Sequence, residues 1–235
     1  MSTSKPALST HGGPLSHAPI VEHAVLRPAA GKLEQGLAFL REAAGLCSLA
    51  ATDDQWSETF RVFRCVEDPS LYLLTGVWPS LDAHDRWITS ERNQQLLVQA
   101  KTVEVDIIDF FHYSLGQPHL PAWFDHAAYI AIGLQYPIHA TDFSSVYAEN
   151  SHVLSSATKG REGGGWRVEA AEVPGEGALQ AGSTADEVQR GDEWIQLSGW
   201  NTVEEHYTFA RSNPDYGANI RTALFAFRLR HWEKL

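Results

Sequence analysis

Two histidines occupy the same place in a repeated passage of this 235-residue chain. His84 lies in GVWPSLDAHDRWITS (76–90) and His206 in SGWNTVEEHYTFARS (198–212), which align without a gap. An imidazole titrates near neutral pH, so either ring is a candidate catalytic acid or base. The structural alternative, a core histidine hydrogen-bonded to a backbone carbonyl, stays open because the residue recurs in both copies.

Each passage predicts a strand that ends in Trp, a hydroxyl residue that caps a helix, and the helix itself. The caps are Ser80 and Thr202. In both helices a histidine takes the middle of three positions spaced i, i+3 and i+7, which share one helical face. The triplets are Leu81, His84 and Ile88 in the first copy, and Val203, His206 and Ala210 in the second. We therefore expect both imidazoles to lie against a sheet.

Large flat side chains near these histidines are candidates for the wall of a substrate pocket. Trp78 and Trp200, at strand ends, are expected to be packing residues. Core packing is the alternative for every aromatic wall candidate. The candidate substrate-binding residues are Trp87, Tyr147, Asn150, Trp166, Tyr207 and Phe209.

Motifs for several other chemistries are missing. No HxH, HExxH or His/Asp/Glu cluster at metal-ligand spacing occurs, so a metal site would need distant residues, and we expect none. GxSxG and Walker loops are absent, and Gly163-Gly164-Gly165 is expected to be a turn before a strand. We expect no cofactor, although nothing selects or excludes a haem ligand among the 11 histidines.

Composition limits the classes of partner. With 29 acidic and 18 basic residues, the chain has a net charge of −11. It therefore lacks the positive field that attracts nucleic acids and anionic membranes. No run of about 18 apolar residues and no signal-peptide pattern occurs. Two cysteines, Cys47 and Cys65, exclude a disulfide framework. We expect a cytoplasmic protein with a small-molecule partner; whether it forms a homodimer stays open.

The elements that position these residues follow one order twice. The first copy predicts strands at 20–26, 60–66, 71–78 and 105–113, with helices at 33–44 and from Ser80 to about Gln99. The second predicts strands at 127–138, 166–173, 192–200 and 220–232, with helices at 142–156 and from Thr202. Each copy reads β-α-β-β-α-β, the ferredoxin-like unit. The fold class is therefore α+β, with two tandem units.

The predicted domain organisation follows from this repeat. It comprises a disordered tail at 1–18, a first unit at 19–115, a linker at 116–126 and a second unit at 127–235, which carries a Gly-rich insertion at 174–191.

The strand ending in Trp, the Ser/Thr cap and the helix reading Leu/Val-acid-x-His resemble the antibiotic biosynthesis monooxygenase (ABM) family of the dimeric α/β-barrel superfamily. The resemblance covers 20–113 in order and motif, and 127–233 more loosely. In most relatives two chains place their sheets face to face. A tandem copy then implies that the antiparallel sheets pack into an intramolecular dimeric α/β-barrel.

This resemblance implies a cofactor-independent enzyme of secondary metabolism that oxidises a polyphenolic, polyketide or anthrone-like substrate with O₂. His84 or His206 would act as base or enolate partner. Two alternatives stay open: a non-oxidative cyclase, dehydratase or pericyclase (Diels–Alderase) reaction in the same pocket, and a non-catalytic ligand-binding barrel. The sequence does not indicate which half holds the working pocket.

Overall fold

The computed structural model describes residues 18–52, 59–115, 120–168 and 192–235, apart from the side chains of residues 141 and 225. The predicted tail lies outside these ranges except for residue 18, and the predicted insertion at 174–191 lies wholly outside them. The strand predicted at 166–173 is described only as far as residue 168.

Two copies of one arrangement make up the described chain. The first contains β1 (Ile20–Pro28), α1 (Leu33–Ala51), β2 (Arg61–Cys65), β3 (Tyr72–Trp78), α2 (Leu81–Thr89), α3 (Glu91–Thr102) and β4 (Val105–Ser114). The second contains β5 (Tyr129–Pro137), α4 (Ala140–Thr158), β6 (Glu162–Arg167), β7 (Trp194–Trp200), α5 (Val203–Ser212), α6 (Pro214–Thr222) and β8 (Leu224–Lys234). A short 3₁₀ turn, η2 (Ala122–Asp125), lies between the copies.

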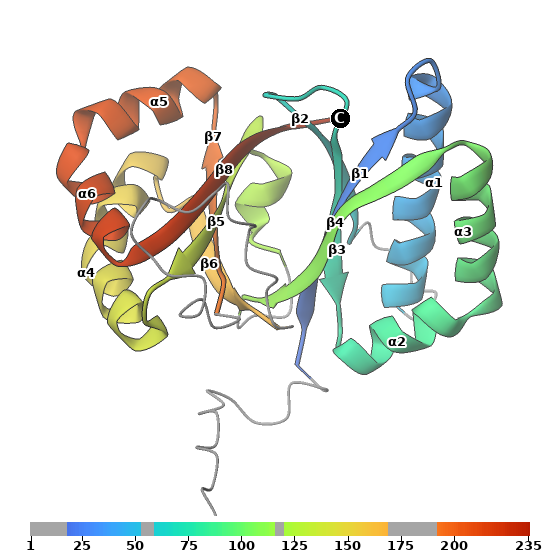
Figure 1. Cartoon of the computed structure of the whole chain (residues 1–235), viewed down its shortest axis with the longest axis horizontal. Helices are drawn as coiled ribbons and strands as arrows, with labels where there is room; N and C mark the ends of the chain where they lie inside the picture. Colours follow the sequence, from blue (N-terminus) through green and yellow to red (C-terminus); the bar gives the residue numbers. More distant parts are fainter. Residues whose placement is uncertain (1–17, 53–58, 116–119, 169–191) are drawn as a thin grey trace, which may run out of the picture.

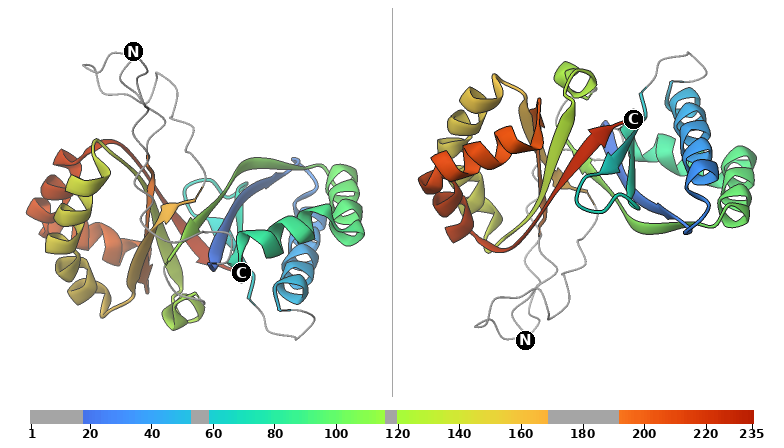
Figure 2. Two further views of the ribbon diagram at one scale, coloured as in Figure 1. Left: turned by 90° about the horizontal axis from the view of Figure 1, so that it is seen from below. Right: turned by 90° about the horizontal axis from the view of Figure 1, so that it is seen from above.

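The eight strands form a closed barrel in the order β1-β3-β2-β8-β5-β7-β6-β4. The two halves join where β2 pairs with β8 and where β4 pairs with β6, both antiparallel. Helices α1–α3 cover one side of the barrel and α4–α6 the opposite side (Figures 1 and 2). The predicted α+β fold of two ferredoxin-like units closing into a barrel within one chain is confirmed.

The barrel interior is a packed core. Alternate residues of each strand point inward, so both halves contribute apolar side chains to one cluster. Its largest members include Phe63, Phe111, Tyr113, Ile130 and Trp232, each almost fully buried. The chemistry suggested by the helix histidines therefore belongs to the outer face of the sheet, between strands and helices.

The helix caps form as predicted, but one predicted helix is two. The Ser80 hydroxyl accepts a hydrogen bond from the amide of Ala83 at 3.1 Å, and the Thr202 hydroxyl accepts from Glu205 at 3.1 Å. The single helix expected from residue 80 to 99 breaks at Ser90, whose hydroxyl accepts from Asn93 and caps α3. No described helix has the length and apolar character needed to cross a membrane.

The three consecutive glycines, 163 to 165, lie inside strand β6, so the predicted turn is wrong. The reason is close packing on both sides of this strand. A Cβ on Gly165 would lie 1.8 Å from the carbonyl oxygen of Ser114 in β4, and one on Gly164 would lie 2.5 Å from the Trp194 ring. Glycine here allows β4 and β7 to approach β6, which closes the barrel.

Candidate functional site: a cavity in the second half

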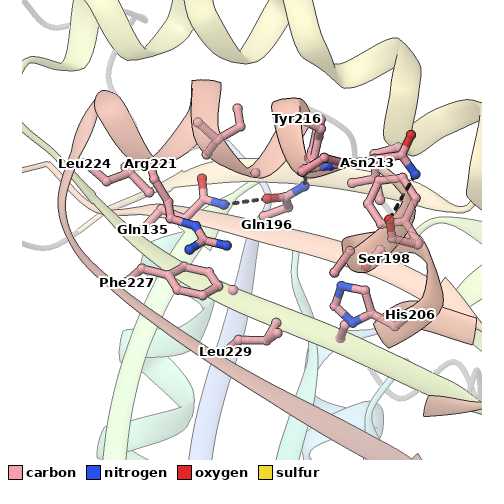
Figure 3. Close-up of a pocket in the computed structure, with 18 residues that line it drawn as sticks. Gln135, Gln196, Ser198, His206, Asn213, Tyr216, Arg221, Leu224, Phe227 and Leu229 are labelled. Atoms are coloured by element: carbon pink, nitrogen blue, oxygen red, sulfur yellow. Dashed lines mark hydrogen bonds between the residues drawn. The ribbon is translucent and has the colours of Figure 1, made fainter. Parts of the chain in front are cut away.

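A cavity of about 190 Å³ lies between the sheet of the second half and its helices. Strands β5, β7 and β8 form its floor, and α4, α5 and α6 form its roof (Figure 3). Small residues of the floor, Ala131, Gly133 and Ser198, leave the space open. The main apolar walls are Leu154, Phe209, Ile220, Leu224, Phe227 and Leu229.

His206 lines this cavity from α5 (Figure 3). Its ring stacks on Trp200 with centroids 4.7 Å apart, and its Nδ1 lies 2.8 Å from Nε2 of His231 on β8. His231 is buried, and its Nδ1 is hydrogen-bonded to the carboxylate of Glu67. Glu67 follows β2 in the first half, so a carboxylate from one half meets the histidine pair of the other.

The order of these three groups fixes the tautomers. Burial raises the pKa of Glu67, but hydrogen bonds from the side chain and backbone of His231 outweigh it and lower that pKa, so the group is a carboxylate. Glu67 then accepts the Nδ1 proton of His231, and Nε2 of His231 accepts the Nδ1 proton of His206. This leaves Nε2 of His206 as a lone-pair acceptor on a ring that lines the cavity.

His206 is neutral at physiological pH. Its pKa is lowered to about 4, chiefly by burial and also by the neighbouring His231, and the charge of Glu67 partly opposes both. A neutral imidazole with a free lone pair is the form a general base needs.

A row of polar groups crosses the floor opposite His206. The Gln135 amide donates to the side-chain oxygen of Gln196, whose own amide donates to the Tyr216 hydroxyl at 2.9 Å. Burial raises the pKa of Tyr216, so it is a neutral phenol at pH 7. Arg221 lines the same cavity, and no carboxylate of the described residues forms an ion pair with it. It supplies a cation for an anionic ligand group.

His84 occupies the equivalent place in the first half but has different surroundings. It is buried in a packed layer, edge-on to Trp78 at 5.4 Å, with its Nε2 3.6 Å from a carboxylate oxygen of Glu22. His112 lies against it, with ring centroids 4.3 Å apart. His84 does not line the second-half cavity.

The structure brings together some of the predicted site residues and separates the others. His206 and Phe209 both line the cavity. Trp87 packs near Trp78 in the core of the first half, because its ring fills that half's helix–sheet layer. Tyr207 is exposed on α5 and lies off the cavity wall, with its ring edge-on to that of His231 at 5.2 Å.

The remaining three candidates also lie off the cavity wall. Tyr147 and Trp166 belong to an aromatic cluster with Trp194, which fills the space between α4 and the β6–β7 edge. Asn150 accepts a hydrogen bond from Asn219 at 3.1 Å and so joins α4 to α6.

Sequence reasoning missed most of the polar groups of the site. One signal for His231 was available: it pairs with Ala131 across β5 and β8 as His112 pairs with Glu22 across β1 and β4. Aligning the closing strands of the two copies would have matched the two histidines. Glu67 carries no such signal, because it reaches the site from the other half.

No protein-family profile matches the sequence, and no curated protein matches it. Solved structures match over nearly the whole chain at low identity. An anthrone oxidase-like protein is 9% identical with a TM-score of 0.56, covering 93% of this chain and 92% of its own. A candidate monooxygenase from Fusobacterium nucleatum subsp. nucleatum is 7% identical with a TM-score of 0.55, covering 93% of each chain.

A candidate chlorite dismutase is 8% identical with a TM-score of 0.55, covering 92% of this chain and 94% of its own. These similarities show the fold. Each of these structures matches the tandem ferredoxin-like barrel over more than nine-tenths of both chains.

Proposed function

We propose that the protein is a cofactor-independent monooxygenase that binds a polyphenolic or anthrone-like molecule in the second-half cavity. One observation carries the proposal: the imidazole on the cavity wall, His206, is backed by His231 and by the carboxylate of Glu67. The name of the anthrone oxidase-like structure supports this class of substrate, as does the sequence resemblance to the ABM family.

Substrate deprotonation is the step that this arrangement serves. Nε2 of His206 takes a proton from the phenol or from the acidic CH₂ of an anthrone. The Nδ1 proton of His206 then passes to His231, so the positive charge is placed beside Glu67. The Glu67 carboxylate stabilises a positive charge placed beside it, so protonation that ends on His231 is favoured over a charge held on His206, whose pKa is about 4.

The resulting enolate needs hydrogen-bond donors and a cation. The amides of Gln135 and Gln196 lie on the cavity floor, and Arg221 lies on its wall. Such fixed dipoles stabilise developing negative charge better than mobile water does. The apolar walls hold the rings of the substrate and exclude water from the anion.

Oxygenation then follows without a bound cofactor. The carbanion gives one electron to O₂, and the carbon radical and superoxide combine to a peroxide that takes up a proton. Loss of water from this hydroperoxide leaves a carbonyl, so a CH₂ and one O₂ give C=O and H₂O. Substrate supplies all the electrons for the reduction of O₂.

Oxygen uptake by the full-length protein tests the proposal, with an anthrone or a naphthol and with no flavin or metal added. We expect one O₂ consumed per quinone formed. Ala131→Leu, which fills the cavity, is expected to remove uptake, whereas Trp87→Phe in the first-half core retains it.

Two results would overturn this assignment. Product formation under strict anaerobiosis would favour a non-oxidative cyclase or related reaction in the same cavity. Saturable binding without turnover in either atmosphere would favour the non-catalytic barrel.

A further inference from the structure

Three metal-ligating side chains meet in the first half, outside the cavity assigned to the reaction. Glu22 comes from β1, His84 from α2 and His112 from β4. Glu22 and His112 are direct cross-strand neighbours on the outer face of the sheet, and His84 of α2 packs against them. The cluster is thus formed by residues far apart in the sequence, so no local sequence motif predicts it.

The three groups converge tightly and lie away from solvent. One ligand atom from each lies within 4.8 Å of the other two, and Nε2 of His84 lies 3.6 Å from Oε2 of Glu22. Glu22, His84 and His112 are exposed by only 5%, 4% and 2%. We infer that these residues form a binding site for one divalent first-row transition metal ion of the Zn²⁺ or Fe²⁺ type.

The donor set selects this class of ion. Two imidazole nitrogens and one carboxylate oxygen suit Zn²⁺, Fe²⁺ and Co²⁺, whereas Ca²⁺ and Mg²⁺ prefer oxygen ligands. Ligand bonds of about 2.1 Å require donor atoms roughly 3 to 4 Å apart in a tetrahedral site. The 3.6 Å between His84 and Glu22 already falls in this range, and the 4.8 Å limit on the other pairs lies about 1 Å beyond it.

A neighbouring group already orients one of the ligands, and a carboxylate stands near a second. The indole of Trp78 donates to Oε2 of Glu22 at 2.8 Å, which leaves Oε1 and the second lone pair of Oε2 for a metal. Asp85 Oδ1 lies 3.8 Å from Nδ1 of His84, the nitrogen opposite the one that approaches Glu22. Carboxylates behind metal-bound histidines commonly fix the ring and raise its basicity.

Access to the site runs past one side chain. The ring of Phe110 lies 5.9 Å from that of His84 and 5.2 Å from that of His112, and this residue is 39% exposed. A rotation of this partly exposed ring would give an ion a route to the two histidines.

The second half supplies an internal control. His206 and His231 occupy the places of His84 and His112, but Ala131 stands where Glu22 does. The carboxylate that reaches this pair, Glu67, binds Nδ1 of His231, on the far side from His206. Glu67, His231 and His206 thus form a linear chain of hydrogen bonds and do not surround one position that a metal ion would occupy. The inference therefore applies to the first half alone.

Metal uptake by the full chain tests the site. The protein is stripped with a chelator, titrated with Co²⁺ or Zn²⁺ and dialysed. We expect one tightly held ion per chain, with visible Co²⁺ bands of a low-coordinate site and a raised Tm. Glu22→Gln keeps an acceptor for Trp78 but is expected to weaken binding by about 100-fold or more. His206→Gln, at the residue of the second half that corresponds to His84, is expected to leave affinity unchanged.

X-ray absorption of the Zn²⁺-loaded wild-type protein provides a second measurement that needs no variant. Two imidazoles and an oxygen ligand are expected around the ion. No uptake by the wild-type protein, equal affinity in Glu22→Gln, loss of binding in His206→Gln, or a shell with fewer than two imidazoles would overturn the inference.

Discussion

The helix–sheet layers of the two halves share one plan and differ in what fills them. Register places Leu26 and Leu74 of the first half in the positions of Gln135 and Gln196 in the second. The two leucines join a closed apolar cluster with residues of α1–α3, whereas the two glutamines line an open cavity. Polar residues on one sheet face thus accompany the change from a packed core to a cavity.

The histidine pairs of the two halves differ in the position of the neighbouring carboxylate. Both halves place one histidine on the helix and one on the closing strand. In the first half Glu22 lies beside both rings, which gathers three ligand atoms around one point. In the second half Glu67 lies behind His231, which orders the groups as a proton relay. Placement of the carboxylate decides which chemistry the pair supports.

Among the substitutions that test this comparison, His206→Gln is expected to have the largest effect on turnover. Loss of the general base should lower kcat/KM for the anthrone or naphthol by about 10² to 10⁴-fold. Steady-state oxygen uptake measures it, and circular dichroism checks the fold. Tyr207→Phe, the adjacent ring on α5, serves as the control and is expected to retain turnover. Turnover by His206→Gln within a factor of three of wild type would remove the second half from the mechanism.

Much of the fold was predictable because its signals are local. Ser80 and Thr202 each stand just before an amphipathic run, a pattern that marks the start of a helix. The duplicated passage around His84 and His206 revealed the repeat. The single helix predicted from Ser80 to about Gln99 is two helices, because Ser90 ends α2 and caps α3 within one apolar pattern.

The candidate site was predictable only in part, because it depends on partners from distant strands. His206 and Phe209 belong to a recognisable helix, so their type and spacing pointed to them. Glu67 and Gln196 have no neighbouring motif. Strand pairing brings Gln196 to the cavity floor, and barrel closure brings Glu67 to His231. Aromatic side chains such as Trp87 fill cores and line pockets with the same chemistry, so composition cannot separate the two roles.

A pair of matched core truncations tests whether one layer is filled and the other open. Leu40→Ala in α1 removes a fully buried side chain from the closed cluster, and Leu154→Ala in α4 removes one that already faces the cavity. We expect losses of unfolding free energy near about 5 kcal/mol for Leu40 and near about 2 to 3 kcal/mol for Leu154. Chemical denaturation measures both; equal losses would contradict the difference between the layers.

Glu67→Gln tests whether the carboxylate behind His231 acts in the second half. The amide still accepts a hydrogen bond but cannot stabilise the charge that His231 gains, so kcat/KM should fall by about 10- to 100-fold, the worth of a charged hydrogen bond. The acid limb of the pH–rate profile should also move to lower pH, which a purely structural role would not cause. Asp68→Asn, which removes the same charge one residue away in an exposed pair with Arg27, should change neither.

The pH dependence of stability gives the smallest expected effect and reports on His206 without any substrate. Its pKa is about 4 in the folded protein and near 6.5 when unfolded, so between these values the unfolded chain binds the extra proton. Stability is therefore lost as the pH falls from 7 to 5, by up to about 2 kcal/mol for this group. In His206→Gln the loss should be smaller by that amount, measured by urea denaturation at both pH values. An unchanged slope would mean that His206 has the same pKa in the folded and unfolded states, which would contradict the lowering of its pKa by burial.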